Sequence, residues 1–376
     1  MLEQDTSKLL NLDLTSLTDD EINSYIELCD AKYIEYKLLQ EALKVICNGL
    51  YGCLGSPYFR FFNLKIAESI TITGHSIIEN SCESVNLYMN KLLKTDGKDF
   101  VLAMDTDSNY IDFSDLVARI APDRSDEVIV NFLDTISKVK IQPMLANSFD
   151  IFSKKTNYYE SRLFMKRESI CKAIFLEKKK RYILKVFDNE GVRLAIPEVK
   201  IVGLESVRSD IPEWCRKRLK QCFTMLFECN QEQMQTFIAD TETEFFQLNV
   251  SKIAKPTSIT DIVKYTDNVG MPVKGATAAA KGSINYNNLL IKHKLQSQFS
   301  QISNGDKIRL LPLKMPNPSN MEIIAFKEKI PVEFGIEKYV NMNILFEKNF
   351  IDPISRVLTV MGWSAIKKYN IGDFFC

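Results

Sequence analysis

The sequence contains very little histidine and no long apolar run. Among its 376 residues only His75 and His293 are histidines, and the nine cysteines show no closely paired spacing. A zinc site is therefore not expected. No signal peptide is visible, and no apolar run approaches the length of a membrane span. These absences predict a protein that is made and kept in a reducing cytoplasm, with no membrane partner.

Net charge is also absent, because 48 Lys and Arg balance 48 Asp and Glu. The net charge of the chain therefore gives no indication of a polyanionic partner. The charges are unevenly placed, however. Residues 1–30 hold eight acids and one base, and residues 152–185 hold eleven bases and three acids. Between Asp267 and Asp306 there is no acid, but four lysines are present: Lys274, Lys281, Lys292 and Lys294. Basic stripes on a neutral protein suit an anionic polymer lying along one face.

What is present most conspicuously is an acidic hairpin pattern. The apolar run 100–104 predicts a buried strand, the sequence Asp-Thr-Asp-Ser at 105–108 predicts a turn, and Tyr110 and Ile111 resume a strand. Asp105 and Asp107 are two residues apart, so on an extended chain they project to the same side. Mg²⁺ binds carboxylate oxygens and adds substrate phosphates to its shell. The alternative is a solvated turn that happens to be rich in Asp.

The N-terminal part predicts two helices. Residues 10–43 show helical periodicity, with a second possible start at Thr18, and six apolar residues between Ile22 and Tyr36 share a face. A following helix begins near Glu41. In it, Lys44, Asn48 and Tyr51 form one stripe that suits a triphosphate, a sugar and a base edge, although an ordinary surface stripe is the alternative. Three glycines weaken this helix and allow a close approach: Gly49, Gly52 and Gly55.

The remaining elements are expected as follows. A strand pair covers 183–199, helices cover 212–229 and 231–248, a strand covers 307–313, and a helix interrupted near Pro353 covers 339–360. The stretch from Ile253 to the turn at Gly305 is irregular and basic. Three cysteines at seven-residue spacing predict one stripe of a helix facing the core: Cys215, Cys222 and Cys229.

Five stretches carry a resemblance to family B DNA polymerases. They are KVICNGLYG at 44–52, AMDTDSNYIDF at 103–113, MKRES at 165–169, KKRY at 179–182 and GLESVRSD at 203–210. Their order and spacing agree with that family, and the replicative polymerases of T-even-type bacteriophages are similar over nearly the whole chain. Two positions depart from the pattern. Gly49 stands where the family usually has Ser, and Met104 stands where the phage enzymes tend to have Gly.

The resemblance implies a role for each matched residue. Asp105, Asp107 and Glu168 would be catalytic, with two Mg²⁺ ions bound by the two aspartates. Lys44, Asn48, Tyr51 and Gly52 would bind the incoming dNTP. Five residues would bind primer-template DNA: Lys179, Lys180, Arg181, Tyr182 and Arg208.

It also implies an α+β fold with an antiparallel palm sheet, a catalytic hairpin, partial helical fingers and a mainly helical thumb. The expected divisions are 1–55 for the C-terminal part of the fingers, 56–203 for the palm, 204–363 for the thumb and 364–376 for a tail.

Some motifs of that family are missing. The sequence has no D-x-x-S-L-Y-P, which supplies the first metal-binding Asp of the palm, and no acidic motifs of the proofreading exonuclease. We therefore expect the C-terminal subunit of a split replicative polymerase, acting in an infected bacterial host and needing an N-terminal polymerase chain that carries both. The alternative is a non-catalytic remnant that binds DNA and a sliding clamp.

The last residues form a separate feature. Ile371, Phe374 and Phe375 lie at i, i+3 and i+4, so one helical turn would present all three. Exposed aromatics on a polar tail usually mark a partner site. The tail resembles the sliding-clamp-binding peptide of replicative polymerases, with Lys368 in place of the customary Gln. The alternative is a tail that packs on the thumb.

Overall fold

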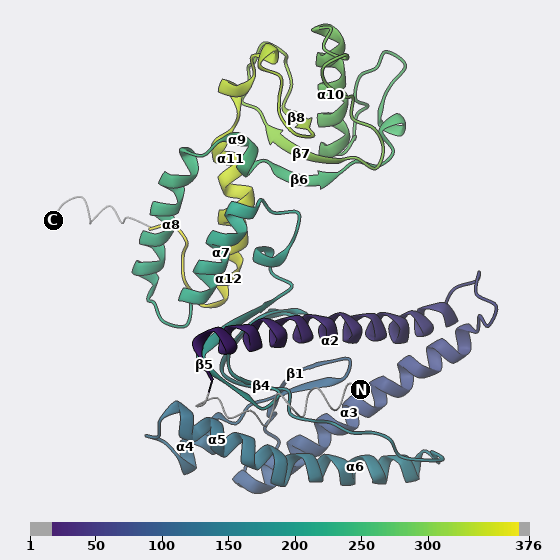
Figure 1. Ribbon diagram of the computed structural model, residues 1–376, viewed down its shortest axis with the longest axis vertical. Helices are drawn as coiled ribbons and strands as arrows, with labels where there is room; N and C mark the ends of the chain where they lie inside the picture. Colours follow the sequence, from purple (N-terminus) through teal and green to yellow (C-terminus); the bar gives the residue numbers. More distant parts are fainter. Residues whose placement is uncertain (1–16, 368–376) are drawn as a thin grey trace, which may run out of the picture.

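The computed structural model describes residues 17–367, in which two hydrophobic cores lie on either side of a three-stranded sheet (Figure 1). The sheet runs in the order β3-β4-β5, with both pairs antiparallel. Its strands are β3 (Ser169–Lys178), β4 (Arg181–Asn189) and β5 (Val192–Val202). The predicted strand pair at 183–199 is thus confirmed as β4 and β5.

The chain begins with a single long helix, α2 (Asp19–Leu54). Its N-terminus is a capping box, in which Thr18 accepts from the backbone N–H of Glu21 and the Glu21 carboxylate accepts from Thr18, so orphan N–H groups are satisfied. The prediction of two helices meeting near residue 41 is wrong for the described residues. Gly49 and Gly52 are tolerated inside the helix, which ends at the C-cap Gly55.

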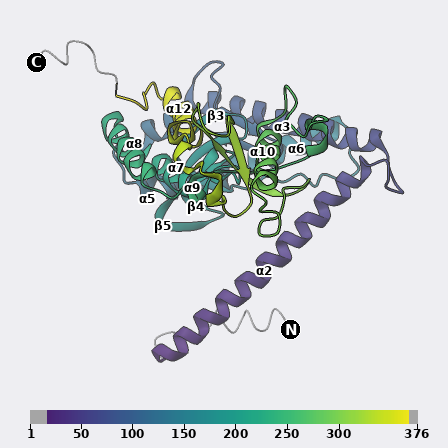
Figure 2. The same cartoon turned by 90° about the horizontal axis from the view of Figure 1, so that it is seen from above.

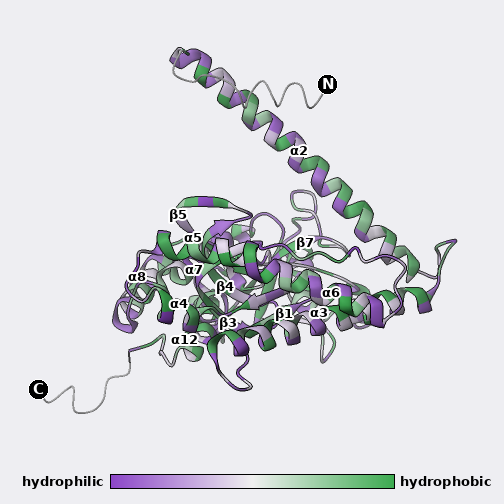
Figure 3. Cartoon of the chain, turned by 90° about the horizontal axis from the view of Figure 1, so that it is seen from below, coloured by the Kyte–Doolittle hydropathy of each residue, from purple (hydrophilic) through white to green (hydrophobic). Residues whose placement is uncertain are grey.

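None of the 36 residues of α2 is buried. Figure 2 shows the helix reaching away from the rest of the molecule, and Figure 3 shows hydrophobic and hydrophilic residues alternating along its whole length. At its C-terminal end the Tyr51 hydroxyl lies 2.7 Å from the hydroxyl of Thr71 on α3 (Leu64–Leu93). The apolar face that the sequence predicted is present, but no other described residue covers it.

The first core lies below the sheet in Figure 1 and is built on α3 and α6 (Gln142–Lys155). Val85 and Met89 of α3 pack with Phe100, and Phe149 of α6 completes the centre. A two-stranded antiparallel hairpin rests on α3. The other elements of this half are β1 (Val101–Asp105), β2 (Ser108–Ile111), α4 (Ser114–Ile120), α5 (Asp126–Ile136) and the π-helical turn η2 (Ser137–Ile141).

The second core begins at Ile183 of β4 and Leu204 and continues through residues 211–365. Cys215 and Cys222 of α7 (Glu213–Met225) are buried in it, as the seven-residue spacing predicted, whereas Cys229 lies past the end of that helix. The other helices here are η3 (Glu205–Val207), α8 (Gln231–Phe246), α9 (Val250–Ile253), η4 (Ile262–Tyr265), η5 (Val332–Phe334), η6 (Glu337–Tyr339), α11 (Met342–Phe346), η7 (Glu347–Ile351) and α12 (Asp352–Val360).

A second three-stranded sheet, in the order β6-β7-β8, lies within this half. It consists of β6 (Lys255–Ser258), β7 (Lys307–Pro312) and β8 (Ile323–Phe326), and α10 (Ala278–Lys292) packs on it. A Cβ at Gly282 of α10 would lie 2.9 Å from the backbone of Ala325, so the small residue permits this contact.

The α+β class is confirmed by these elements. The expectation of an irregular stretch after Ile253 is wrong over α10, and the region expected to be mainly helical also contains this sheet.

Candidate active site

Asp105 and Asp107 lie at the tip of the β1–β2 hairpin. Asp105 ends β1, and the backbone N–H of Asp107 donates to the carbonyl of Asp105 over 2.6 Å. Thr106 between them has a φ of 55°, which closes the turn. Asp105 is half-buried and Asp107 is exposed. The predicted hairpin with two carboxylates at its tip is therefore present.

The hairpin is anchored from below by α3. Asn109 of β2 donates a side-chain hydrogen bond to the buried hydroxyl of Ser81 over 2.7 Å. At the other end, Phe100 and Val101 are buried in the first core. These contacts fix the hairpin at its base while leaving its tip open to solvent.

The turn between β3 and β4 meets this hairpin from the sheet. The Nζ of Lys180 lies 3.7 Å from Oδ1 of Asp105. Two residues further on, the Tyr182 hydroxyl accepts a hydrogen bond of 2.7 Å from the Tyr110 hydroxyl, and the two rings meet edge to face. The structure thus brings the predicted catalytic and primer-binding segments together at the boundary between the two cores.

Glu168 belongs to the same neighbourhood. It lies just before β3, and the negative charges of Glu168 and Asp105 both help to raise the pKa of Tyr110, after burial and the hydrogen bond to Tyr182. Lys200 of β5 lies 3.4 Å from the Glu168 carboxylate. Two of the three predicted catalytic carboxylates, Asp105 and Glu168, therefore act electrostatically on the Tyr110 phenol.

The hairpin tip suits a hard divalent cation, because Asp105 and Asp107 offer carboxylate oxygens in a half-open position. Lys180 is the positive group that stands beside Asp105 in this structure. Within residues 17–367 no group of three or more His, Cys, Asp and Glu side chains is placed to hold a metal ion.

The predicted DNA-binding residues behave differently from one another. Lys179 and Lys180 are exposed on the turn. Arg181, by contrast, is only 12% exposed and binds Glu177 and Glu205, so its guanidinium supports the turn from behind. Arg208 is half exposed and makes a bidentate pair with Asp210, with both distances 2.9 Å.

The predicted nucleotide-binding stripe lies on the last turns of α2. Lys44, Asn48 and Tyr51 are all exposed and follow helical spacing along one face. Tyr51 and Gly52 line a hollow of about 470 Å³ between α2 and α3. A Cβ at Gly49 or Gly52 would meet nothing within 4 Å, so the expected close approach of another backbone is not seen among the described residues.

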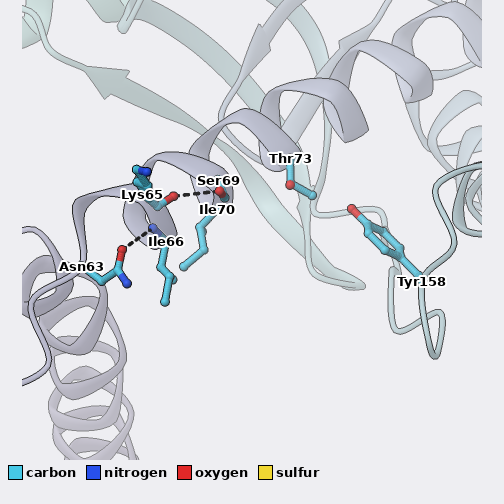
Figure 4. A pocket seen from close by; sticks show the side chains of 7 residues that line it. All are labelled: Asn63, Lys65, Ile66, Ser69, Ile70, Thr73 and Tyr158. Atoms are coloured by element: carbon cyan, nitrogen blue, oxygen red, sulfur yellow. Dashed lines mark hydrogen bonds between the residues drawn. The ribbon is translucent and has the colours of Figure 1, made fainter.

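A second open groove, of about 550 Å³, lies between the first turns of α3 and the loop after α6 (Figure 4). Asn63 caps α3 by accepting from the N–H of Ile66, and the hydroxyl of Tyr158 faces Thr73 across the groove in Figure 4. No predicted site residue lines this groove, which is separate from the hairpin tip.

Three contacts around the predicted site were missed by sequence reasoning. Tyr110 pairs with Tyr182, Glu205 binds Arg181, and Arg356 of α12 binds Glu205. Glu205 lies inside the matched segment 203–210, which was the only signal for it, and nothing in the sequence marks Arg356. The predicted clamp-binding residues Ile371, Phe374 and Phe375 lie outside the described residues.

The described residues thus contain an acidic hairpin tip, a basic turn that meets it, and an exposed helical stripe of Lys44, Asn48 and Tyr51. The sequence model of DNA polymerase family B matches residues 27–332, and the chain belongs to that family. No helix among residues 17–367 is long and apolar enough to cross a membrane.

Several curated proteins are similar to this chain. The DNA-directed DNA polymerase of Enterobacteria phage T4 is 29% identical over 96% of the chain and 41% of its own length. That of Escherichia phage RB69 is 31% identical over 97% of the chain and 43% of its own length. DNA polymerase II of Escherichia coli (strain K12) is 23% identical over 66% of the chain and 30% of its own length. The chain thus spans about two fifths of its phage relatives.

Proposed function

We propose that this chain is the C-terminal subunit of a split DNA-directed DNA polymerase that adds dNTPs to a primer 3′ end. The observation that carries the proposal is the meeting of Asp105 with Lys180, and of Tyr110 with Tyr182, where the acidic hairpin faces the basic turn. In the reaction the primer 3′-hydroxyl gives up its proton to water and its oxygen forms a bond to the α-phosphorus of the dNTP. The bond from that phosphorus to the oxygen bridging the β-phosphate breaks, and pyrophosphate leaves with that oxygen.

The residues take the following roles in this proposal. Asp105 and Asp107 hold Mg²⁺, which when bound neutralises charge on the phosphate oxygens. Glu168 adds negative charge to the same patch, and Lys179, Lys180, Tyr182 and Arg208 contact the primer-template DNA. Arg181 supports their turn. The dNTP lies against α2, where Lys44 and Asn48 hold the triphosphate and Tyr51 and Gly52 contact the nascent base pair.

A separate polypeptide supplies the remaining palm carboxylate and the exonuclease. This part of the proposal is supported by the uncovered face of α2. On that face Ile22, Cys29, Tyr36, Leu43 and Leu50 recur every seven residues, with further apolar residues between them. A seven-residue apolar repeat is the pattern by which helices pack together along a seam. Leu43 and Leu50 are 54% and 64% exposed, which is unusual for such a pattern.

The divisions of the molecule follow the same proposal. Residues 17–55 form the end of the fingers, 56–203 the palm and 204–363 the thumb, whose α10 carries Lys281 and Lys292 toward the duplex phosphates. The tail from residue 364 binds a sliding clamp. The curated relatives from phages T4 and RB69 support the cytoplasm of an infected bacterium as the place of action.

The test is primer extension with purified components. The chain alone is expected not to extend a primer, whereas the chain mixed with a polypeptide carrying the missing Asp is expected to do so in Mg²⁺. Asp107→Asn should reduce extension by the mixture by at least about 10³-fold, since one metal-binding charge is lost. Asp123→Asn, which changes an exposed aspartate in the turn after α4, is the matched control.

Three results would contradict the proposal. Robust extension by the chain alone would remove the need for a second polypeptide. Wild-type rates for Asp107→Asn would remove the hairpin from the site. DNA binding by a mixture that never extends a primer would favour a non-catalytic remnant.

A further inference from the structure

Four alternating charges connect the β3–β4 turn to α12. Glu177 accepts from Nε of Arg181 over 2.8 Å. Both carboxylate oxygens of Glu205 accept from Nη2 of Arg181, at 2.9 and 2.7 Å. The Glu205 carboxylate also accepts from Nη2 of Arg356 over 2.7 Å. Because the first three side chains are only 7–12% exposed, these pairs are shielded from water and stronger than surface pairs.

The same network fixes the backbone of the turn. Nη1 of Arg181 donates to the carbonyl of Gly203 over 3.0 Å. Gly203 in turn lies against Lys180, since a Cβ at Gly203 would fall 2.1 Å from the Lys180 carbonyl oxygen. Lys180 itself has a φ of 62°, a conformation that surrounding contacts must hold in place. Glu205 therefore stabilises, through Arg181, the conformation that directs Lys180 toward Asp105.

The strand that follows the turn has two different faces. Ile183 of β4 belongs to the core of the C-terminal half, together with Leu204 and α12. Tyr182 lies between Arg181 and Ile183, so its side chain projects to the opposite face, where it meets Tyr110. A shift of the turn relative to α12 would consequently move Tyr182 relative to the catalytic hairpin.

We propose that Glu205 is a positioning residue for the primer terminus. Through Arg181 it holds Lys180 and Tyr182 beside the hairpin. Through Arg356 it makes the position of these two residues depend on the position of α12. Contact of the C-terminal half with duplex DNA is thereby coupled to recognition of the 3′ end. This inference rests on the proposed function, because only a polymerase has a primer terminus to position.

The experiment compares the affinity of the chain for two duplexes that differ in which end is recessed. The full chain is titrated with two duplexes of equal length, one with a recessed 3′ end and one with a recessed 5′ end, at one salt concentration. General phosphate contacts contribute to both Kd values, and recognition of the primer terminus contributes only to the first. The ratio of the two Kd values is the preference for a 3′ end.

Glu205→Gln and Arg356→Met are each expected to lower this preference at least fivefold, with less than a twofold change for the recessed 5′ duplex. The double variant should be no worse than either single variant, since both break the same chain of charges. Arg356→Lys should restore most of the preference. Lys348→Met is the matched control, because the Lys348 side chain is 63% exposed. Its Nζ lies 3.3 Å from the carboxylate of Asp352, four residues further along the same helical segment.

The outcomes separate the two proposals. Variants that melt at lower temperature but keep the wild-type preference would show that Glu205 only stabilises the fold, and the inference would fall. Because Arg356 is half exposed, we expect Arg356→Met to fold, so that its preference for a 3′ end can be measured even if Glu205→Gln does not fold. A wild-type chain with no preference for a 3′ end would overturn the proposed function, and the inference with it.

Discussion

The Tyr110 hydroxyl donates a 2.7 Å hydrogen bond to the Tyr182 hydroxyl, and this bond joins the hairpin on one core to the sheet on the other. A second link runs from Arg167, just before β3, which donates over 2.7 Å to Asp134 of α5 and also binds the buried Asp188 of β4. Polar contacts therefore join the hairpin and α5 to the β3-β4-β5 sheet. Such contacts are sensitive to single polar substitutions.

The first prediction concerns the ionisation of Tyr110. Burial and the bond to Tyr182 raise its pKa above the ordinary value. Since the folded pKa is raised, its contribution to stability is complete below the unfolded pKa and is lost as pH rises toward the folded one. In a spectrophotometric titration to about pH 11, Tyr110→Phe should leave the number of ionising tyrosines unchanged.

The second prediction concerns Gly203, whose φ is 67° and whose Cβ would meet the Lys180 carbonyl at 2.1 Å. Gly203→Ala adds a backbone clash to the strain of a positive φ, and we expect a loss of roughly 3 kcal/mol or more in the free energy of unfolding. Gly97 has a φ of 61° with open space around it. Gly97→Ala should therefore cost only about 1 kcal/mol. Equal losses in denaturant titrations would exclude the close packing on Lys180.

The third prediction concerns cysteine reactivity on α2. Cys29 and Cys47 are exposed, whereas burial raises the pKa of Cys215 and of Cys222 to about 12. Alkylation at neutral pH should modify Cys29 and Cys47 and spare Cys215 and Cys222. Addition of the polypeptide carrying the missing palm motif should slow alkylation of Cys29 and Cys47, because it covers their face. Unchanged rates in a complex that extends primers would place the partner elsewhere.

The fourth prediction concerns α10 and the duplex. Lys281 and Lys292 are eleven residues apart, which places them within about 20° around the helix axis, and Lys294 follows the helix. Neutralising all three should flatten the log–log salt dependence of duplex binding by up to about 2.7, at about 0.9 per phosphate contact. Three lysines that pair four residues away with an acid provide the control set: Lys138, Lys217 and Lys348. An identical slope in both triple variants would move the duplex away from α10.

The fifth prediction concerns the tail. Deleting residues 371–376 should leave single-nucleotide insertion unchanged but shorten the products made with a sliding clamp. A tether to the clamp raises the local concentration of polymerase at the primer without touching the chemistry. Phe374→Ala with Phe375→Ala should reproduce the deletion, since the two rings supply most of the apolar area. Loss of thermal stability and insertion together would instead make the tail part of the thumb.

Much of the site could be predicted from the sequence, because its parts are local. The hairpin tip at 105–107 and the helix start at Thr18 each depend on residues that are neighbours in the chain. Turn chemistry and strand patterning act over a few residues, so they are legible without a fold. The resemblance to family B polymerases followed from the same short stretches.

The tertiary structure decided which side chains are exposed and can contact DNA or another polypeptide. Arg181 stands in a basic run that predicts contact with DNA, yet Glu205 and Arg356, 24 and 175 residues further along the chain, determine that it faces the interior. No periodicity connects positions so far apart, because a charge can be neutralised by any group that the fold brings near. The periodicity of α2 likewise predicted an apolar face, but only the arrangement of α3 and the two cores determined that no described residue covers it.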